Sequence, residues 1–151
     1  MLDCGANNVT ECLQSPGNAD DQTAAATSAP NRRASFDCEA PSSALEIVIC
    51  ADAELGKTDI EMTQAYHDAD KAMTASQHKG LIDSERQWLR FVSKACPLGT
   101  VGGIPSVLAR SCVRAAFLTR ILQLQACPQK NLQERMPCLN DFYVIEKSTM
   151  Q

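Results

Sequence analysis

The sequence predicts an all-α protein: a small, disulfide-stapled helical bundle or hairpin of about four helices, with irregular extensions at the N- and C-terminal ends. Apolar residues recur at steps of three and four along residues 44–126, as they do on one face of a helix. Aromatic residues make up only 5% of the chain and alanine is abundant, which favours helices over a β-sandwich. Eight cysteines in 151 residues, without any Cys-x-x-Cys spacing, favour disulfides over a zinc site.

Composition divides the chain into three parts. Residues 1–34 are predicted to be an N-terminal arm and linker, because the stretch 15–35 is small, polar and interrupted by proline and glycine. Residues 35–126 are predicted to form the helical domain, and residues 127–151 a C-terminal extension packed on that domain. A chain of 151 residues is long enough for one domain with its own core.

Charge and hydropathy exclude several classes of protein. The net charge of −4 comes without a dominant basic patch, so no nucleic-acid partner is expected. No apolar run approaches the roughly 20 residues of a membrane helix, so no membrane span is expected. A disulfide-rich chain belongs in an oxidising compartment. We therefore expect a periplasmic or secreted protein whose signal peptide is absent from this sequence.

The first two helices are predicted from a cap and an apolar stripe. Ser42 or Ser43 is expected to cap a short helix over residues 44–50, with Glu46 in its first turn. A longer helix is predicted over residues 53–75. Its apolar stripe consists of Leu55, Met62, Tyr66, Ala69 and Met73.

The third helix, over residues 81–95, is expected to follow a turn at Gly80. Trp88 lies on its broad apolar face, and we expect it to pack in the core, with a partner-binding anchor as the alternative. Residues 97–105 are rich in proline and glycine and are expected to hold no regular element.

The fourth helix is predicted over residues 106–126 and has two apolar stripes. One stripe consists of Leu108, Ala115, Leu118 and Leu122; the opposite stripe consists of Val113, Phe117 and Leu124. A helix that is apolar on two sides is usually buried on two sides. We expect the second stripe to pack under the terminal segments, with a partner-binding patch as the alternative. Residues 128–151 are expected to be irregular, with a short extended piece at 142–145.

Pairing between neighbouring cysteines is the preferred disulfide pattern, although eight cysteines allow 105 pairings. The preferred bridges are Cys4–Cys12, Cys38–Cys50, Cys96–Cys112 and Cys127–Cys138. The second would fasten the incoming chain to the first helix, and the third would clamp the loop between the third and fourth helices. Each bridge is expected to contribute about 2–4 kcal/mol by restricting the unfolded chain.

Short motifs follow one another along residues 35–125 in a recognisable order. They are Ser35-Phe36-Asp37-Cys38, Glu46, Ile49-Cys50-Ala51-Asp52, Glu54-Leu55, Asp59, Ala65-Tyr66, Glu85-Arg86-Gln87-Trp88-Leu89, Cys96, Cys112, Thr119-Arg120 and Leu122. Together they resemble the LprI-like lysozyme-inhibitor family, whose members are small helical domains of bacterial envelope and secreted proteins. The chain has Val92 where that family commonly has an arginine. The cysteines outside the shared region are Cys4, Cys12, Cys127 and Cys138.

The resemblance implies a protein-binding function. The expected protein is a periplasmic or secreted inhibitor that binds a lysozyme or another peptidoglycan-degrading enzyme and occludes its cleft. An acidic inhibitor would gain electrostatic steering toward basic lysozymes. The alternatives are an immunity protein that neutralises an injected cell-wall-targeting toxin, and a structural envelope protein without an enzymatic partner. No cofactor, metal or catalytic residue is predicted, and the oligomeric state stays open.

Two carboxylates, Asp59 and Glu85, project toward otherwise apolar helix faces. A buried carboxylate needs a partner. Arg86 is the first choice, with Arg90 and Arg120 as further choices. We expect a structural lock between the second and third helices. The alternative is an acid–base pair of the kind that glycosidases use, but nothing else in the chain indicates a sugar-cleaving site.

The loop between the third and fourth helices is a candidate partner-binding site, although a plain connector is the preferred interpretation. Its candidate residues are Gly99, Thr100, Val101, Gly102 and Gly103. A disulfide at its base would leave a rigid, protruding tip, and rigid loops enter clefts at low entropic cost. The two histidines, His67 and His78, are expected to be solvated surface residues.

Overall fold

The computed structural model describes residues 33–142. Residues 1–32 and 143–151 lie outside the described part, and so does the predicted Cys4–Cys12 bridge. Five α-helices are present in the described part, and the all-α prediction is confirmed. The elements in chain order are α3 (Ala44–Cys50), α4 (Ala53–Ala72), α5 (Ala75–Ala95), β1 (Thr100–Val101), β2 (Ile104–Pro105), α6 (Val107–Ala126), the 3-10 helix η4 (Cys127–Gln129) and α7 (Leu132–Leu139). The structure thus adds one helix and one small hairpin to the four predicted helices.

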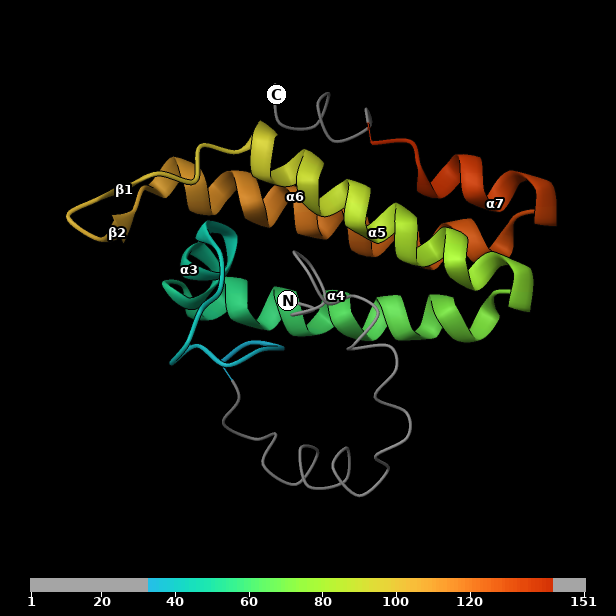
Figure 1. Cartoon of the computed structure of the whole chain (residues 1–151), viewed down its shortest axis with the longest axis horizontal. Helices are drawn as coiled ribbons and strands as arrows, with labels where there is room; N and C mark the ends of the chain where they lie inside the picture. The colour runs from blue at the N-terminus through green and yellow to red at the C-terminus, as the bar shows by residue number, and fades with distance from the viewer. Residues whose placement is uncertain (1–32, 143–151) are drawn as a thin grey trace, which may run out of the picture.

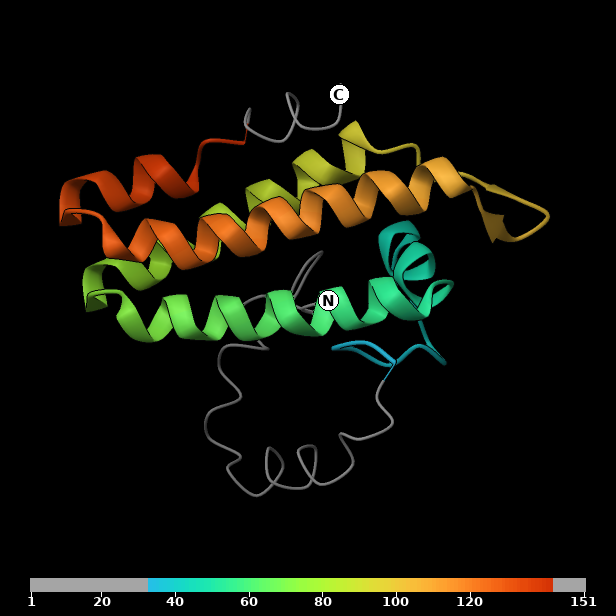
Figure 2. The same cartoon turned by 180° about the vertical axis from the view of Figure 1, so that it is seen from behind.

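The long helices α4, α5 and α6 share the long axis of the molecule (Figure 1). α4 forms one layer, α5 and α6 form the other, and α6 packs along α4. α3 contacts both α4 and α6 near the end where the β1–β2 hairpin projects. η4 and α7 lie at the opposite end, where α7 packs on α5 (Figure 2). The hairpin and α7 therefore mark the two ends of the molecule.

The core lies between the two layers. The predicted stripe of α4 is buried along its whole length: Leu55, Met62, Tyr66, Ala69 and Met73. Trp88 of α5 is also buried, and its ring centroid lies 5.1 Å from that of Phe117 of α6. Trp88 therefore packs in the core, as expected, and is not an exposed anchor.

Local caps place the first two helices where the sequence predicts them to begin. α3 spans the predicted residues 44–50, and the Ser43 Oγ caps it by accepting a hydrogen bond from the Glu46 N–H at 3.2 Å. The Glu46 carboxylate reaches back to Ser42, whose N–H and hydroxyl donate to it at 3.2 and 2.6 Å. Asp52 caps α4 by accepting from two backbone N–H groups of its first turn.

The turn between α4 and α5 does not lie at Gly80, and that prediction is wrong. α4 ends at Ala72 and α5 begins at Ala75. Between them, the Thr74 N–H donates at 3.3 Å to a side-chain oxygen in the first turn of α5. Gly80 lies inside α5, where an added Cβ would stand 3.1 Å from the end of the Met136 side chain of α7. Glycine here permits close packing between α5 and α7.

The C-terminal segment is partly helical, which corrects the prediction that residues 128–151 are irregular. η4 and α7 follow α6, and Leu139 of α7 is buried. Pro137 lies inside α7. A proline within a mostly polar segment weakens the helical pattern, which is why periodicity missed this helix. Phe142, the first residue of the expected extended piece, lies in a turn, and the rest of that piece is outside the described residues.

Candidate partner-binding surface

Three disulfides form within residues 33–142: Cys38–Cys50, Cys96–Cys112 and Cys127–Cys138. They are three of the four bridges that local pairing predicts, and each has a Cα–Cα distance of 5.6 Å. The first ties the incoming chain to the end of α3. The second ties the end of α5 to α6, and the third ties α7 to the end of α6.

The segment between α5 and α6 is a two-stranded antiparallel hairpin, which corrects the prediction that it holds no regular element. β1 pairs with β2 so that Thr100 lies opposite Pro105. The two turn residues are Gly102 and Gly103, with φ of 61° and 78°. A two-residue hairpin turn of this kind needs positive φ at both positions, which glycine adopts without steric cost. The consecutive glycines therefore make the hairpin possible.

The hairpin is fixed at its base and exposed at its tip. Cys96 is buried and bridged to Cys112, while Leu98 and Pro105 are shielded against the body of the protein. The exposed tip residues are Gly99, Thr100, Gly102 and Gly103. The structure therefore brings the candidate residues of the loop together on one short projection at the end of the molecule (Figure 1).

α6 is buried on one side only, so the prediction that both of its apolar stripes are buried is wrong. The buried stripe consists of Val113, Phe117 and Leu124, which leaves no partner patch there. On the other stripe, Leu108, Leu118 and Leu122 are 67%, 46% and 66% exposed. α3 and α4 pack on α6 from the opposite side. We call Leu108, Ala115, Leu118 and Leu122 the α6 stripe.

The α6 stripe continues at both ends of the helix. Ile104 in β2 of the hairpin and Val107 at the start of α6 are each 69% exposed. At the other end, a groove of about 720 Å³ lies beside α7 and is lined in part by Leu122, Ala126 and Pro137. The exposed side of α6 therefore runs from an apolar projection at the hairpin to an apolar groove beside α7.

A buried ion pair joins α5 to α6 beneath the end of α7. Glu85 Oε2 accepts hydrogen bonds from Arg120 Nε and Nη2 at 3.1 and 3.0 Å, and both side chains are fully buried. Arg120 also donates to Ser84 Oγ at 3.1 Å and to the Leu139 carbonyl at 2.7 Å. Its guanidinium carbon lies 5.6 Å from the centroid of the Trp88 ring. Two helices and the end of α7 thus share one arginine.

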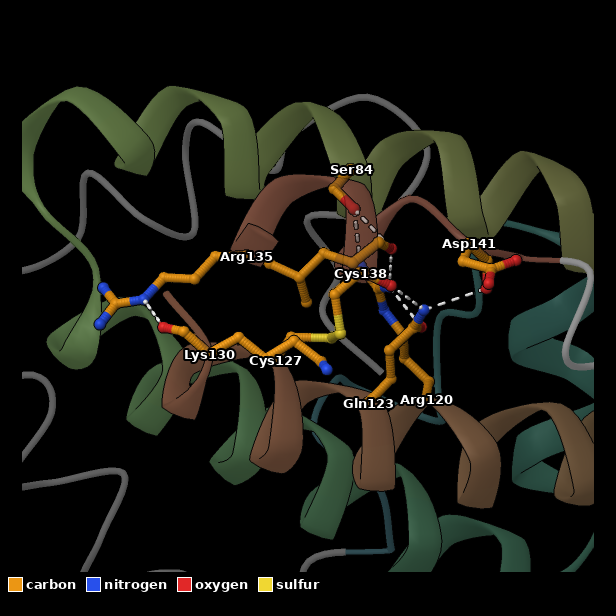
Figure 3. Close-up of a disulfide and its surroundings, with 9 residues drawn as sticks. Ser84, Arg120, Gln123, Cys127, Lys130, Arg135, Cys138 and Asp141 are labelled. Atoms are coloured by element: carbon orange, nitrogen blue, oxygen red, sulfur yellow. Dashed lines mark hydrogen bonds between the residues drawn. A yellow bond between two sulfur atoms is a disulfide. The ribbon is translucent and has the colours of Figure 1, made fainter. Parts of the chain in front are cut away.

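The third disulfide holds α7 over this arginine (Figure 3). Gln123 Nε2 donates to the carbonyls of Cys138 and Asp141 at 2.6 and 3.1 Å, and its Oε1 accepts from Arg120 Nη1 at 2.8 Å. At the start of α7, Arg135 Nε donates to the Lys130 carbonyl at 3.1 Å. Apart from the Arg120 guanidinium, the partners of Gln123 and Arg135 here are backbone carbonyls, which give no signal in a sequence.

The predicted carboxylate–arginine lock joins a different pair of helices from the pair expected. Glu85 pairs with Arg120 and so joins α5 to α6, not the second predicted helix to the third. Burial raises the pKa of Glu85, and the charge and hydrogen bonds of Arg120 oppose that rise. A carboxylate without solvent access cannot reach a substrate, so Glu85 supports the structural interpretation. Asp59, also buried, accepts from the Ser35 N–H at 2.7 Å, and a contact with Arg86 stays a prediction.

The two histidines are half-buried, not fully solvated as expected. His78 Nδ1 is hydrogen-bonded to the Asp70 carboxylate, which links the start of α5 to the end of α4. Burial lowers the pKa of His67, whose ring meets that of Tyr66 edge-on with centroids 5.9 Å apart. Burial has the opposite effect on the Tyr66 hydroxyl, whose pKa it raises. These groups therefore belong to the packing of α4 and α5.

Within residues 33–142, no three His, Cys, Asp or Glu side chains lie together as they would around a metal ion. None of the helices described is long and apolar enough to cross a membrane.

Charge is strongly segregated along the described chain. Residues 33–85 contain eleven acidic and four basic residues, whereas residues 86–133 contain seven basic residues and no acidic one. The first range includes α3 and α4, and the second includes the hairpin and α6. The net charge of the whole chain conceals this division, which a count of charges by segment reveals.

The chain was compared with known proteins. Residues 38–124 match a family model described as "Lysozyme inhibitor LprI". The match covers the first two disulfides of the described part, the hairpin and nearly all of α6, and it ends before the third disulfide and α7. No curated protein and no solved structure matches the chain.

Proposed function

Because the chain belongs to the LprI family of lysozyme inhibitors, we propose that it is a periplasmic or secreted protein that binds a lysozyme or a related peptidoglycan-degrading enzyme and blocks its cleft. The disulfides support a place in an oxidising compartment. Blocking a cleft requires a binding surface and no chemistry, so we assign the chain no cofactor and no catalytic residue.

The β1–β2 hairpin is the element that we assign to the cleft, and its geometry carries the proposal. It projects from one end of the molecule, and Cys96–Cys112 joins the two helices at its base. The turn at Gly102 and Gly103 makes the tip narrow. Little conformational entropy is lost when such a preorganised projection binds.

The charge distribution fits a cleft of this kind. Glycosidases commonly carry two carboxyl groups beside the scissile bond, and an acidic tip would be repelled by them. The hairpin carries no charged residue, and the exposed Lys94 stands in the last turn of α5 just before it. The acidic residues, most of which precede residue 86, would act at longer range on a basic enzyme. Binding is therefore expected to weaken as salt rises.

The test is a muramidase inhibition assay with the oxidised full-length chain and a variant in which residues 99–103 are replaced by a short serine linker. We expect the replacement to abolish inhibition without a large change in the helical circular dichroism spectrum, because the hairpin lies outside the core. A matched control is Gln64→Ser, an exposed residue in the middle of α4, far from the hairpin.

Three outcomes decide between the parts of the proposal. Loss of inhibition in the linker variant alone supports the hairpin as the binding element. Equal inhibition by the wild type and the linker variant removes the hairpin from the site but keeps the function. If the wild type binds no wall-degrading enzyme, either in the assay or in a pull-down from periplasmic extract, the proposed function itself is wrong.

A further inference from the structure

The α6 stripe has an internal symmetry that the proposed function does not use. Leu108 and Leu122 lie seven residues before and seven residues after Ala115. Seven residues are about two helical turns, so these three side chains point in nearly the same direction from the helix. Leu118 lies on the same exposed side. Leu108 and Leu122 are therefore placed symmetrically about Ala115, whereas Leu118 has no apolar counterpart in the stripe.

The two ends of α6 differ in shape. Eleven residues before Ala115, Ile104 of β2 is exposed in the hairpin, and Val107 and Leu108 are exposed at the start of α6. Eleven residues after it, Ala126 lines the groove of about 720 Å³ beside α7. An apolar projection and an apolar groove thus lie at opposite ends of one helix.

We propose that this face binds a second copy of the chain, with the two α6 helices antiparallel and a two-fold axis beside Ala115. In a two-fold interface each copy offers the same surface to the other, so the surface must be complementary to itself. Under this symmetry Leu108 of one copy lies beside Leu122 of the other. The exposed Ile104 of each copy reaches the groove of its partner beside α7.

Side-chain size along the helix suits this arrangement. Ala115 would face its own counterpart, and a small residue at that position lets two helices approach to about 8–10 Å. Leu118, which stands three residues after Ala115, would lie beside the small Ser111 of the other copy, which stands four residues before Ala115. A bulky residue facing a small one is the pattern that lets two helices interlock.

Charge also favours a second copy over other partners. The groove is lined by two acidic residues, Glu134 and Asp141, and by one basic residue, Lys130. The hairpin and α6, which would meet that groove from the other copy, contain no acidic residue and are preceded by the exposed Lys94. Acidic groups at one end of the face would therefore meet basic groups at the other. The inference goes beyond the proposed function and does not depend on it.

The test is sedimentation velocity of the oxidised full-length chain over a range of concentrations. We expect a reversible dimer for the wild type. Leu118→Arg places a charge in the centre of the interface and is expected to raise the dissociation constant by about 30-fold or more, as loss of a central contact does. The matched control is Ile60→Arg, an exposed isoleucine on α4, which should leave the dimer unchanged.

A second variant tests the position of the axis. Ala115→Cys would place two cysteines opposite each other across the axis, so mild oxidation should link the two copies covalently. Gln64→Cys on α4 is the control and should give no specific dimer. A wild type that stays monomeric at every concentration overturns the inference, as does a dimer that neither Leu118→Arg nor Ala115→Cys affects.

The enzyme assay separates this inference from the proposed function. Leu118→Arg should inhibit muramidase at least as well as the wild type does per chain, because its hairpin is intact and no longer engaged by a second copy. If the wild type is monomeric and Leu118→Arg abolishes inhibition, the α6 stripe is a surface for the enzyme and the second copy is ruled out.

Discussion

The hairpin end and the α7 end of the molecule are each closed by a disulfide between neighbouring cysteines, but the two bridges have very different surroundings. Cys96–Cys112 spans 16 residues and supports a projection with exposed apolar residues. Cys127–Cys138 spans 11 residues and holds α7 over a fully buried ion pair. Bridges of such similar span restrict the unfolded chain to a similar extent. Cysteine spacing thus predicts which residues pair, whereas the surroundings decide what each bridge is for.

The largest effect is expected at the α7 end. Arg120→Met would leave the Glu85 carboxylate buried without its partner, which typically costs about 3–5 kcal/mol. We expect a loss of unfolding free energy of that size in urea denaturation followed by circular dichroism. The folded fraction should still inhibit muramidase, because the hairpin is far from the ion pair.

Arg114→Met is the matched control for this prediction. Arg114 pairs with Asp52 at 3.4 Å on a partly exposed surface, and such pairs contribute about 0–1 kcal/mol. Equal losses of unfolding free energy in Arg120→Met and Arg114→Met would contradict the view that the α7 end carries the more important polar contact.

Removing each disulfide in turn distinguishes most clearly between the roles of the two ends of the molecule. Replacing either pair of cysteines by serine is expected to lower stability by about 2–4 kcal/mol. Only the Cys96→Ser/Cys112→Ser variant should also lose inhibition at a temperature where both variants are folded. The measurement is a melting curve for each variant followed by the muramidase assay. If loss of the Cys127–Cys138 bridge impaired inhibition equally, the division of roles between the two ends would be wrong.

A smaller effect is expected within the hairpin. Gly103→Ala forces a side chain into left-handed backbone, which costs roughly 1–2 kcal/mol, and should weaken inhibition because the turn is distorted. Gly99→Ala is the control, since its Cβ would meet no atom within 4 Å. Inhibition constants for the two variants, measured side by side, test this. A Gly103→Ala variant that inhibits as well as Gly99→Ala would argue against the turn as part of the binding surface.

The smallest effect concerns pH. Burial raises the pKa of Glu85 above its ordinary value of 4.5, so the folded state holds the proton more tightly than the unfolded state. The stability gained in this way is complete below pH 4.5 and is lost as the pH rises through the raised pKa. The unfolding free energy of the wild type should therefore fall, relative to that of Glu85→Gln, as the pH rises above 4.5. Parallel pH profiles for the two proteins would contradict the raised pKa.

What the sequence predicted well is local. The start of α3 depends on Ser43 and Glu46, which lie within one turn of each other. The stripe of α4 depends on spacing within one helix. The bridges join cysteines that are close along the chain, so the ends of neighbouring helices bring them together.

What the sequence missed depends on contacts between distant residues. Gly80 looked like a turn because the sequence does not reveal that Met136 packs against it. The sequence favours Arg86 as the partner of Glu85, because the observed partner, Arg120, stands 35 residues away along the chain. The exposed side of α6 could not be recognised from α6 alone, because apolar spacing is the same whether or not another element covers it.

The most direct test of the central claim, that the hairpin end blocks a peptidoglycan-degrading enzyme, is a titration of muramidase activity with the oxidised full-length chain. We predict saturable inhibition that disappears when residues 99–103 are replaced and persists in Arg120→Met at a temperature where that variant is folded. Undiminished inhibition without the hairpin tip, or muramidase activity that no amount of the wild type lowers, would contradict it.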